Sequence, residues 1–171
     1  IKKGNIDSSQ TCLAIGPGTG LGFSVLRHIG NIPYVYPTEL GNTRSFNDGL
    51  SKLFEIKNSN NFTVLEDYLS GTGIKKIYAE KSGKNLTAEE IVSRYHEDDL
   101  ASFVLNNFVV AINNILQDLA LTFNAMGGIF FAGSLMRTIS EMNSINYIKE
   151  EFNKHSSEAH SDILKNISIN L

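Results

Sequence analysis

The stretch Thr11-Cys12-Leu13-Ala14-Ile15-Gly16-Pro17-Gly18-Thr19-Gly20-Leu21-Gly22 decides the fold. Its first five residues are mostly apolar, as in a short strand, and a glycine-rich break follows them. The apolar pattern resumes over residues 21–29, and Gly30-Asn31 is a turn signal before a third apolar stretch at residues 32–36. The sequence therefore predicts an antiparallel meander of three strands whose first turn is very rich in glycine.

Helical patterns follow the meander. We expect helices at residues 45–54 and 63–70, a further short one after Gly73, and one at residues 88–95 that starts from a capping box of Thr87 and Glu90. Residues 98–124 form the clearest helix, because their polar residues fall in one narrow stripe that repeats every seven positions. Most of this helix is predicted to be buried.

The last third of the chain predicts a buried strand between helices. Residues 129–132 are wholly apolar, which suits a strand that is buried on both faces. Gly133-Ser134 follows, and then an amphipathic helical pattern over residues 136–154. Alternation over residues 163–171 predicts a last strand. Because the chain does not begin with Met and stops in this strand, we expect truncation at both ends.

Composition excludes several classes of protein. The 171 residues, 42% hydrophobic and 19% charged, are enough for one globular domain with a proper core. The formal net charge of −3 argues against binding to nucleic acid or an anionic membrane, since both need clustered positive charge. No apolar run reaches the roughly 18–20 residues that span a bilayer. Cys12 is the only cysteine, so no internal disulfide forms, and a cytoplasmic setting is expected.

Two segments after strands could carry chemistry. The glycines at residues 16–22 would let the backbone approach a phosphate, and Thr19 adds a hydroxyl, although a tight glycine-rich hairpin explains them equally. The segment is neither a Walker A loop, since no Lys follows, nor a dinucleotide fingerprint, since a strand follows. In Thr38-Glu39-Leu40-Gly41-Asn42, the carboxylate of Glu39 could accept hydrogen bonds from neighbouring sugar hydroxyls or lie in a surface turn.

Two later segments also qualify. Residues 65–73 look like a helix that ends at Gly71, with Glu66 in its last turns, where the helix dipole disfavours a carboxylate. The Gly133-Ser134 turn could hold a flat ligand, with phosphate favoured at the following helix, or could be a plain connection. Other polar groups are weaker candidates: no metal site is predicted from His155 and His160, and a solvated surface is predicted for Lys75, Lys76, Lys81 and Lys84.

In order, these four segments resemble the sugar-kinase part of the hexokinase–actin superfamily, and bacterial-type glucokinases in particular. Residues 16–22 look like its second phosphate motif, and residues 129–135 resemble its adenosine motif. Residues 38–42 look like the sugar-contacting segment, which is Glu-Gly-Gly-His in bacterial glucokinases and Thr-Glu-Trp-Gly in hexokinases. Residues 69–73 resemble the Leu-Ser-Gly-Pro-Gly segment, with Glu66 at the second sugar-binding carboxylate. The resemblance covers about residues 6–171.

The resemblance implies an α/β domain of the ribonuclease-H-like (actin-like ATPase) class, with a mixed five-stranded sheet flanked by helices. Residues 1–171 would be the larger C-terminal domain of a two-domain sugar kinase. The intact protein would use ATP with Mg²⁺ to phosphorylate the 6-hydroxyl of glucose to glucose 6-phosphate, as in glycolysis. It also implies a homodimer, because bacterial members are commonly dimers.

The resemblance also assigns residues. ATP phosphates would be held by Gly18, Thr19 and Gly20, and the adenine or ribose by Gly133, Ser134 and Leu135. The hexose hydroxyls would be held by Glu39, Asn42 and Glu66. The general base, an Asp, belongs to the smaller N-terminal domain together with the first phosphate motif. No catalytic residue is therefore expected within this chain, and the chain alone is expected to be inactive.

Two departures from the family pattern leave alternatives open. Asn42 stands where bacterial glucokinases have His, and Leu40 replaces a Gly, which narrows the expected pocket. Both changes bear on the choice of sugar. Besides a glucokinase, the sequence allows a kinase of another hexose, such as an N-acetylated sugar, and a sugar-binding or regulatory homologue that has lost catalysis.

Overall fold

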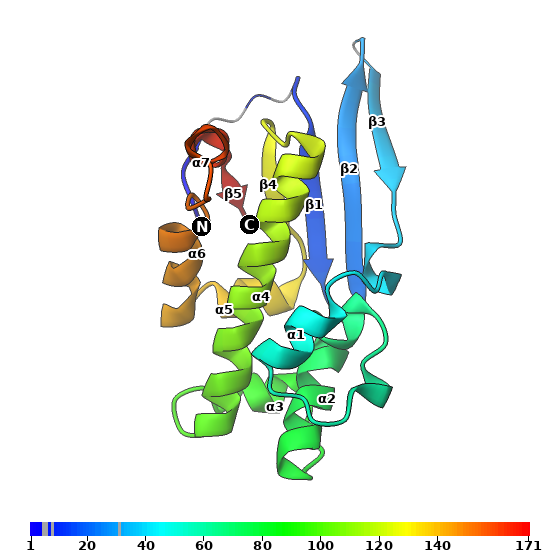
Figure 1. Cartoon of the computed structure of the whole chain (residues 1–171), viewed down its shortest axis with the longest axis vertical. Coiled ribbons are helices and arrows are strands. Elements are labelled where there is room, and N and C mark those ends of the chain that lie inside the picture. Colours follow the sequence, from blue (N-terminus) through cyan, green and yellow to red (C-terminus); the bar gives the residue numbers. More distant parts are fainter. Residues whose placement is uncertain (5–6, 8, 31) are drawn as a thin grey trace.

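The computed structural model describes residues 1–4, 7, 9–30 and 32–171, which form one mixed sheet with helices packed on it (Figure 1). The strand order is β3-β2-β1-β4-β5. Strands β1, β2 and β3 are the predicted antiparallel meander, and β4 and β5 run parallel to β1. The strands are β1 (Cys12–Pro17), β2 (Leu21–Ile29), β3 (Ile32–Pro37), β4 (Gly128–Phe131) and β5 (Ile169–Asn170). The mixed five-stranded sheet of the resemblance is confirmed.

Helix α4 (Asp99–Phe123) is the pillar of the domain, as predicted, and Figure 1 shows it lying along the sheet. Its 25 residues give a length of about 38 Å. Asp98 caps its first turn by accepting from the N–H groups of Leu100 and Ala101, at 2.9 and 3.2 Å. It is also the one helix in the described part of the chain that is long and apolar enough to cross a membrane, and about half of its apolar window is buried.

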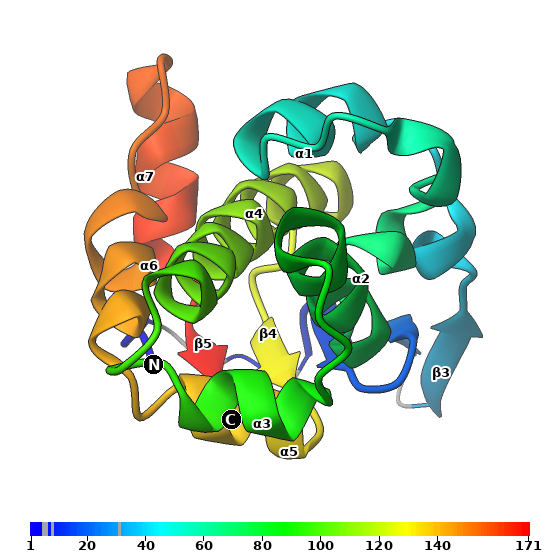
Figure 2. The same ribbon diagram turned by 90° about the horizontal axis from the view of Figure 1, so that it is seen from below.

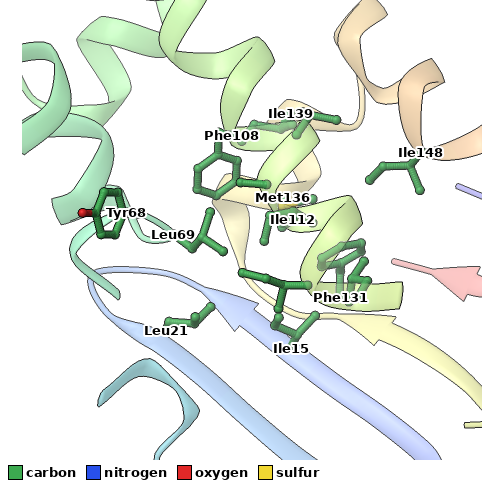
Figure 3. Close-up of a cluster of buried hydrophobic side chains, with 14 of the residues drawn as sticks. Ile15, Leu21, Tyr68, Leu69, Phe108, Ile112, Phe131, Met136, Ile139 and Ile148 are labelled. Carbon is green, nitrogen blue, oxygen red and sulfur yellow. The ribbon is translucent and has the colours of Figure 1, made fainter. Parts of the chain in front are cut away.

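The core lies between α4 and one face of the sheet. Phe108 and Ile112 of α4 are fully buried and belong to one cluster with Ile15 of β1 and Phe131 of β4 (Figure 3). The polar stripe predicted along this helix is exposed or half-buried except at Asn113, which is 1% exposed. Replacing a fully buried Phe such as Phe108 by Ala costs about 3–5 kcal/mol in comparable cores.

The remaining helices are shorter, and Figure 2 shows α6 and α7 on one side of α4 and α1 and α2 on the other. They are α1 (Asn47–Leu53), α2 (Gly71–Ser82), α3 (Ala88–Ser93), α5 (Ser134–Ile139), α6 (Asn146–Glu151) and α7 (Glu158–Asn166). Single 3₁₀ turns occur at Leu40–Asn42, Ser59–Asn61, Leu65–Asp67 and Asn143–Ile145. The capping box of Thr87 and Glu90 at the start of α3 is present as predicted.

The helix predicted over residues 63–70 is wrong. Only the 3₁₀ turn Leu65–Asp67 forms there, and the carboxylate of Asp67 caps its start by accepting the N–H groups of Thr63 and Val64, at 2.8 and 3.1 Å. The turn does not continue through residue 70, because Ser70 has the extended backbone of an N-cap, with a φ of −146° and a ψ of 172°. Gly71 begins a helix instead of ending one, since Ser70 is the N-cap of α2 and its Oγ accepts from the N–H of Gly73 at 2.9 Å.

The helix predicted over residues 136–154 is divided into α5, a 3₁₀ turn and α6. The hydroxyl of Ser140 donates to the carbonyl of Arg137 at 2.6 Å, and Met142 is extended, with a ψ of 151°. A side chain that takes up a helical carbonyl in this way weakens the helix at that turn. The interruption turns Glu141 and Met142 out of the helical path.

The strand predicted over residues 163–171 is mostly helix: α7 runs to Asn166, and only Ile169–Asn170 form β5. The buried Lys2 explains where α7 ends. Its ammonium donates to the carbonyls of Leu164, Lys165 and Ile167, at 3.2, 3.1 and 2.6 Å. The backbone of Lys2 also exchanges two hydrogen bonds of 3.0 Å with Ile169, so the first described residues pair with the last strand.

Candidate functional site

The glycine-rich turn between β1 and β2 is pinned to the start of α2. The carbonyl of Gly18 accepts the N–H of Gly71 at 2.7 Å, and the carbonyl of Thr19 accepts the hydroxyl of Thr72 at 2.7 Å. Within the described residues, no acceptor holds the N–H groups of Thr19 and Gly20. Consecutive free N–H groups of this kind suit an anion.

A cavity of about 770 Å³ opens on one side of this turn. It lies between the turn, α2, α3 and α5, and Figure 2 shows these helices around one end of the sheet. Gly18, Thr19 and Thr72 form one end of its wall. A Cβ added at Gly18 would meet nothing within 4 Å, so the turn leaves open space where a ligand could approach its backbone. We call this space the nucleotide cavity, after the ligand that the resemblance assigns to Gly18, Thr19, Ser134 and Leu135 of its lining.

The rest of the nucleotide cavity has a more apolar wall. Val92 and Tyr95 contribute from the α3 side, and Leu135 and Met142 from the α5 side. The hydroxyl of Tyr95 donates to the side-chain oxygen of Asn106 on α4 at 2.8 Å, which fixes this wall to the central helix. Apolar and aromatic side chains on facing walls are suited to a flat base.

A second polar group lies on the other side of the turn, and we call it the carboxylate cluster: Glu39, Asn42 and Glu66. The half-buried Glu66 accepts the N–H of Leu21 at 3.2 Å. The amide of Asn42 donates to the carboxylate of Glu39 at 3.0 Å. Gly41, between these two residues, lies so close that an added Cβ would be 3.0 Å from the Glu66 carboxylate and 2.8 Å from the carbonyl of Leu21. The cluster thus joins three segments at the start of β2.

Asp67, next to Glu66, holds this region together. It is 9% exposed and forms an ion pair with Lys76 of α2, in addition to its bonds to Thr63 and Val64. Burial raises the pKa of the Asp67 carboxyl, but the bond to Lys76 and the two backbone bonds outweigh it and hold the pKa below its ordinary value of 3.8. Asp67 is therefore a charged anchor at neutral pH.

The structure brings most of the predicted site residues to the two sides of one turn. Gly18, Thr19, Ser134 and Leu135 line the nucleotide cavity. Gly133 precedes α5 with a φ of 97°, and an added Cβ there would be 3.7 Å from the carbonyl of Pro17. Gly20 lies against the carboxylate cluster instead: an added Cβ would be 2.8 Å from the Glu66 carboxylate.

The sequence did not identify the α2 and α3 walls of the nucleotide cavity. Gly71 and Thr72 were assigned to a helix end beside Glu66, yet they line the cavity. The signal that could have found them is Ser70, a good N-cap with a glycine three residues later. The solvated surface predicted for four lysines is confirmed for Lys75 and Lys84, which are exposed, although Lys75 also lines the cavity. It is corrected for the other two, since Lys76 pairs with Asp67 and Lys81 pairs with Glu55 at 3.2 Å.

Proteins of known sequence and structure are similar to this chain over most of its length. A curated glucokinase of Saccharophagus degradans is 27% identical over 183 aligned positions, which cover 100% of this chain and 56% of that protein. The crystal structure of a glucokinase from an Antarctic psychrotroph superposes with a TM-score of 0.75 at 22% identity, covering 99% of this chain and 56% of that one. A ROK family glucokinase from Streptomyces griseus, solved in complex with glucose and AMPPNP, has a TM-score of 0.59 at 15% identity, covering 95% and 55%.

These likenesses define the fold as that of glucokinase and ROK sugar kinases, which have the actin-like ATPase architecture. The chain spans about half the length of the curated relatives that it matches. The sequence model of the family described as Glucokinase matches residues 1–171, the whole of the chain. The chain therefore belongs to the glucokinase family.

Proposed function

We propose that the natural protein is an ATP-dependent hexose kinase that phosphorylates the 6-hydroxyl of glucose. One observation carries this proposal. A single turn, residues 18–20, has a nucleotide cavity on one side and a carboxylate cluster on the other. A phosphoryl group held at that turn would lie between its donor and a sugar.

The nucleotide side supports binding of ATP. The free N–H groups of Thr19 and Gly20 would hold phosphate oxygens, and the base would lie between the facing apolar walls. Mg²⁺ would arrive on the phosphates and lower their charge during transfer. Among the described residues, no group of three or more His, Cys, Asp and Glu side chains is placed to hold a metal ion by itself.

The sugar side supports binding of a hexose. Carboxylates accept hydrogen bonds from hydroxyls, and each such charged bond contributes about 1.5–3 kcal/mol. Glu39 is exposed and Glu66 is half-buried, so both keep acceptor capacity for a ligand. Phosphoryl transfer depends mainly on positioning and electrostatics, and the resemblance assigns the general base to an Asp in the other domain. We propose that residues 1–171 alone bind substrates without turnover.

Asn42 bears on which hexose is used. Its amide occupies one oxygen of Glu39, at 3.0 Å, where bacterial glucokinases carry His. This bond takes up an acceptor that a sugar hydroxyl would otherwise use. It favours, as the second candidate, a kinase of another hexose such as an N-acetylated sugar. A cytoplasmic location and a homodimer stay predictions.

A titration of the protein in its full natural length tests the proposal. ADP release is followed with ATP and, in turn, glucose, mannose and N-acetylated hexoses. We expect ADP release that depends on glucose, and no release from the 171-residue chain by itself. Release only with an N-acetylated hexose would select the second candidate. Saturable sugar binding without ADP release from any hexose would instead identify a homologue that has lost catalysis.

A further inference from the structure

Lys75 is a cation in the nucleotide cavity that neither the sequence motifs nor the proposed function uses. It lies on α2, three residues after Thr72 and therefore on the same face of the helix, one turn further along. Thr72 is tied to Thr19 of the glycine-rich turn by its 2.7 Å hydrogen bond. Both Thr72 and Lys75 line the cavity. Lys75 is thus placed beside the end of the cavity where the turn would hold phosphates.

Lys75 is also unpaired. Within the described part of the chain its ammonium makes no hydrogen bond and no ion pair, whereas the next residue, Lys76, is engaged by Asp67. The two neighbouring lysines differ in their surroundings: Lys76 faces Asp67, and Lys75 is exposed on the cavity wall. Lys is a flexible point charge, well suited to reach a phosphate.

The other charged side chains on the wall of the cavity are acidic, so a cation there would help to bind an anionic ligand. The acidic side chains in the described lining are Glu89 and Glu141, and His96 also lines the wall. Without Lys75 these walls would present only negative charge to a ligand that itself carries several negative charges. One cation placed near the turn offsets this repulsion where the phosphates would lie.

We propose that Lys75 binds the phosphates of the nucleotide from the α2 side, opposite the base. This inference rests on the proposed binding of ATP in the cavity. It assigns the polarity of the ligand: phosphates lie toward Thr19, Thr72 and Lys75, and the base lies toward Val92 and Met142. A nucleoside without phosphates would not use Lys75.

Calorimetric titration of the 171-residue chain with ATP, ADP, AMP and adenosine tests the role of Lys75. Lys75→Gln removes the charge and keeps most of the length. We expect this variant to bind ATP about tenfold more weakly and ADP severalfold more weakly, while adenosine stays within twofold of the wild-type chain. Lys84→Gln is the matched control, since Lys84 is exposed just after α2 and does not line the cavity. It should leave all four affinities unchanged.

Salt dependence and charge rescue sharpen the test. The wild-type affinity for ATP should fall more steeply with added KCl than that of Lys75→Gln, and Lys75→Arg should retain most of the affinity. If the wild-type chain binds ATP and Lys75→Gln binds it equally well, the role of Lys75 is overturned and the nucleotide cavity stands. Equal loss of ATP and adenosine in Lys75→Gln would also overturn it. Binding of neither ligand by the wild-type chain would overturn both.

Discussion

The two sides of the glycine-rich turn differ in how complete they are. The nucleotide cavity has walls from α2, α3 and α5 and a volume of about 770 Å³, all supplied by this chain. The carboxylate cluster consists of an exposed Glu39, an exposed Asn42 and a half-buried Glu66, and none of the three lines that cavity. If the proposed function holds, this chain alone would enclose the nucleotide, whereas the sugar would lie on an open surface.

Glu66→Gln is expected to give the largest difference between the effect on the hexose and the effect on ATP. The amide oxygen of Gln can still accept the N–H of Leu21, so the fold should persist while the charge offered to a sugar hydroxyl is lost. We expect kcat/KM for the hexose to fall by about 10- to 100-fold, equivalent to about 1.5–3 kcal/mol. The KM for ATP should stay within about twofold.

Steady-state kinetics of the full-length protein measure this effect. Glu97→Gln serves as the control, because Glu97 is exposed and does not line the nucleotide cavity. A parallel rise in the KM values for both substrates would mean that Glu66 supports the whole turn and not the sugar side alone.

Gly41→Ala should distort the sugar side by packing. The new Cβ would lie 2.8 Å from the carbonyl of Leu21, which is backbone and cannot move aside cheaply. We expect a loss of about 1–3 kcal/mol in the free energy of unfolding, measured by denaturant titration. Gly49→Ala is the matched control, since its Cβ would meet nothing within 4 Å in α1, and a Gly-to-Ala change in a helix is neutral or stabilising. Equal stability of the two variants would contradict the close contact.

Gly18→Ala should weaken ligand binding and leave the stability of the fold nearly unchanged, the opposite of Gly41→Ala. Its added Cβ meets nothing within 4 Å, so the free energy of unfolding should change by less than about 0.5 kcal/mol. The methyl group would occupy space beside the turn, and we expect ATP to bind about fivefold more weakly, a change of roughly 1 kcal/mol. Calorimetry with ATP and denaturant titration of the same sample compare the two quantities. An unchanged affinity for ATP would mean that the phosphates do not lie beside Gly18.

The smallest effect is expected from Asp67→Asn, which removes the charge of the anchor that both sides share. Because the pKa of Asp67 is held below 3.8 in the folded state, its charge stabilises the fold above that pH. This contribution is lost as the pH falls through the lowered pKa. We expect the variant to be about 1 kcal/mol less stable at neutral pH, and the difference to vanish in acid. A difference that is independent of pH would assign the loss to packing.

The sheet and α4 could be predicted from the sequence because their patterns are long or strongly punctuated. Residues 63–70 and 136–154 could not, because local features interrupt an apolar pattern that continues in the sequence: the N-cap at Ser70, and the bond from Ser140 to the carbonyl of Arg137. The carboxylate cluster and half of the cavity followed from resemblance to known motifs. Val92 and Tyr95 carry no local signal, since only the packing of α3 toward α5 makes them walls of one cavity.

The bridge between Lys2 and Ile169 has a mechanical consequence. The two segments are antiparallel, so Ile1 and Leu171 leave the bridge on the same side (Figure 1). A pulling force applied between these two residues would peel the pair and break the two backbone hydrogen bonds one after the other, instead of shearing them together. Tension between these two residues would thus fall first on β5, at the edge of the sheet.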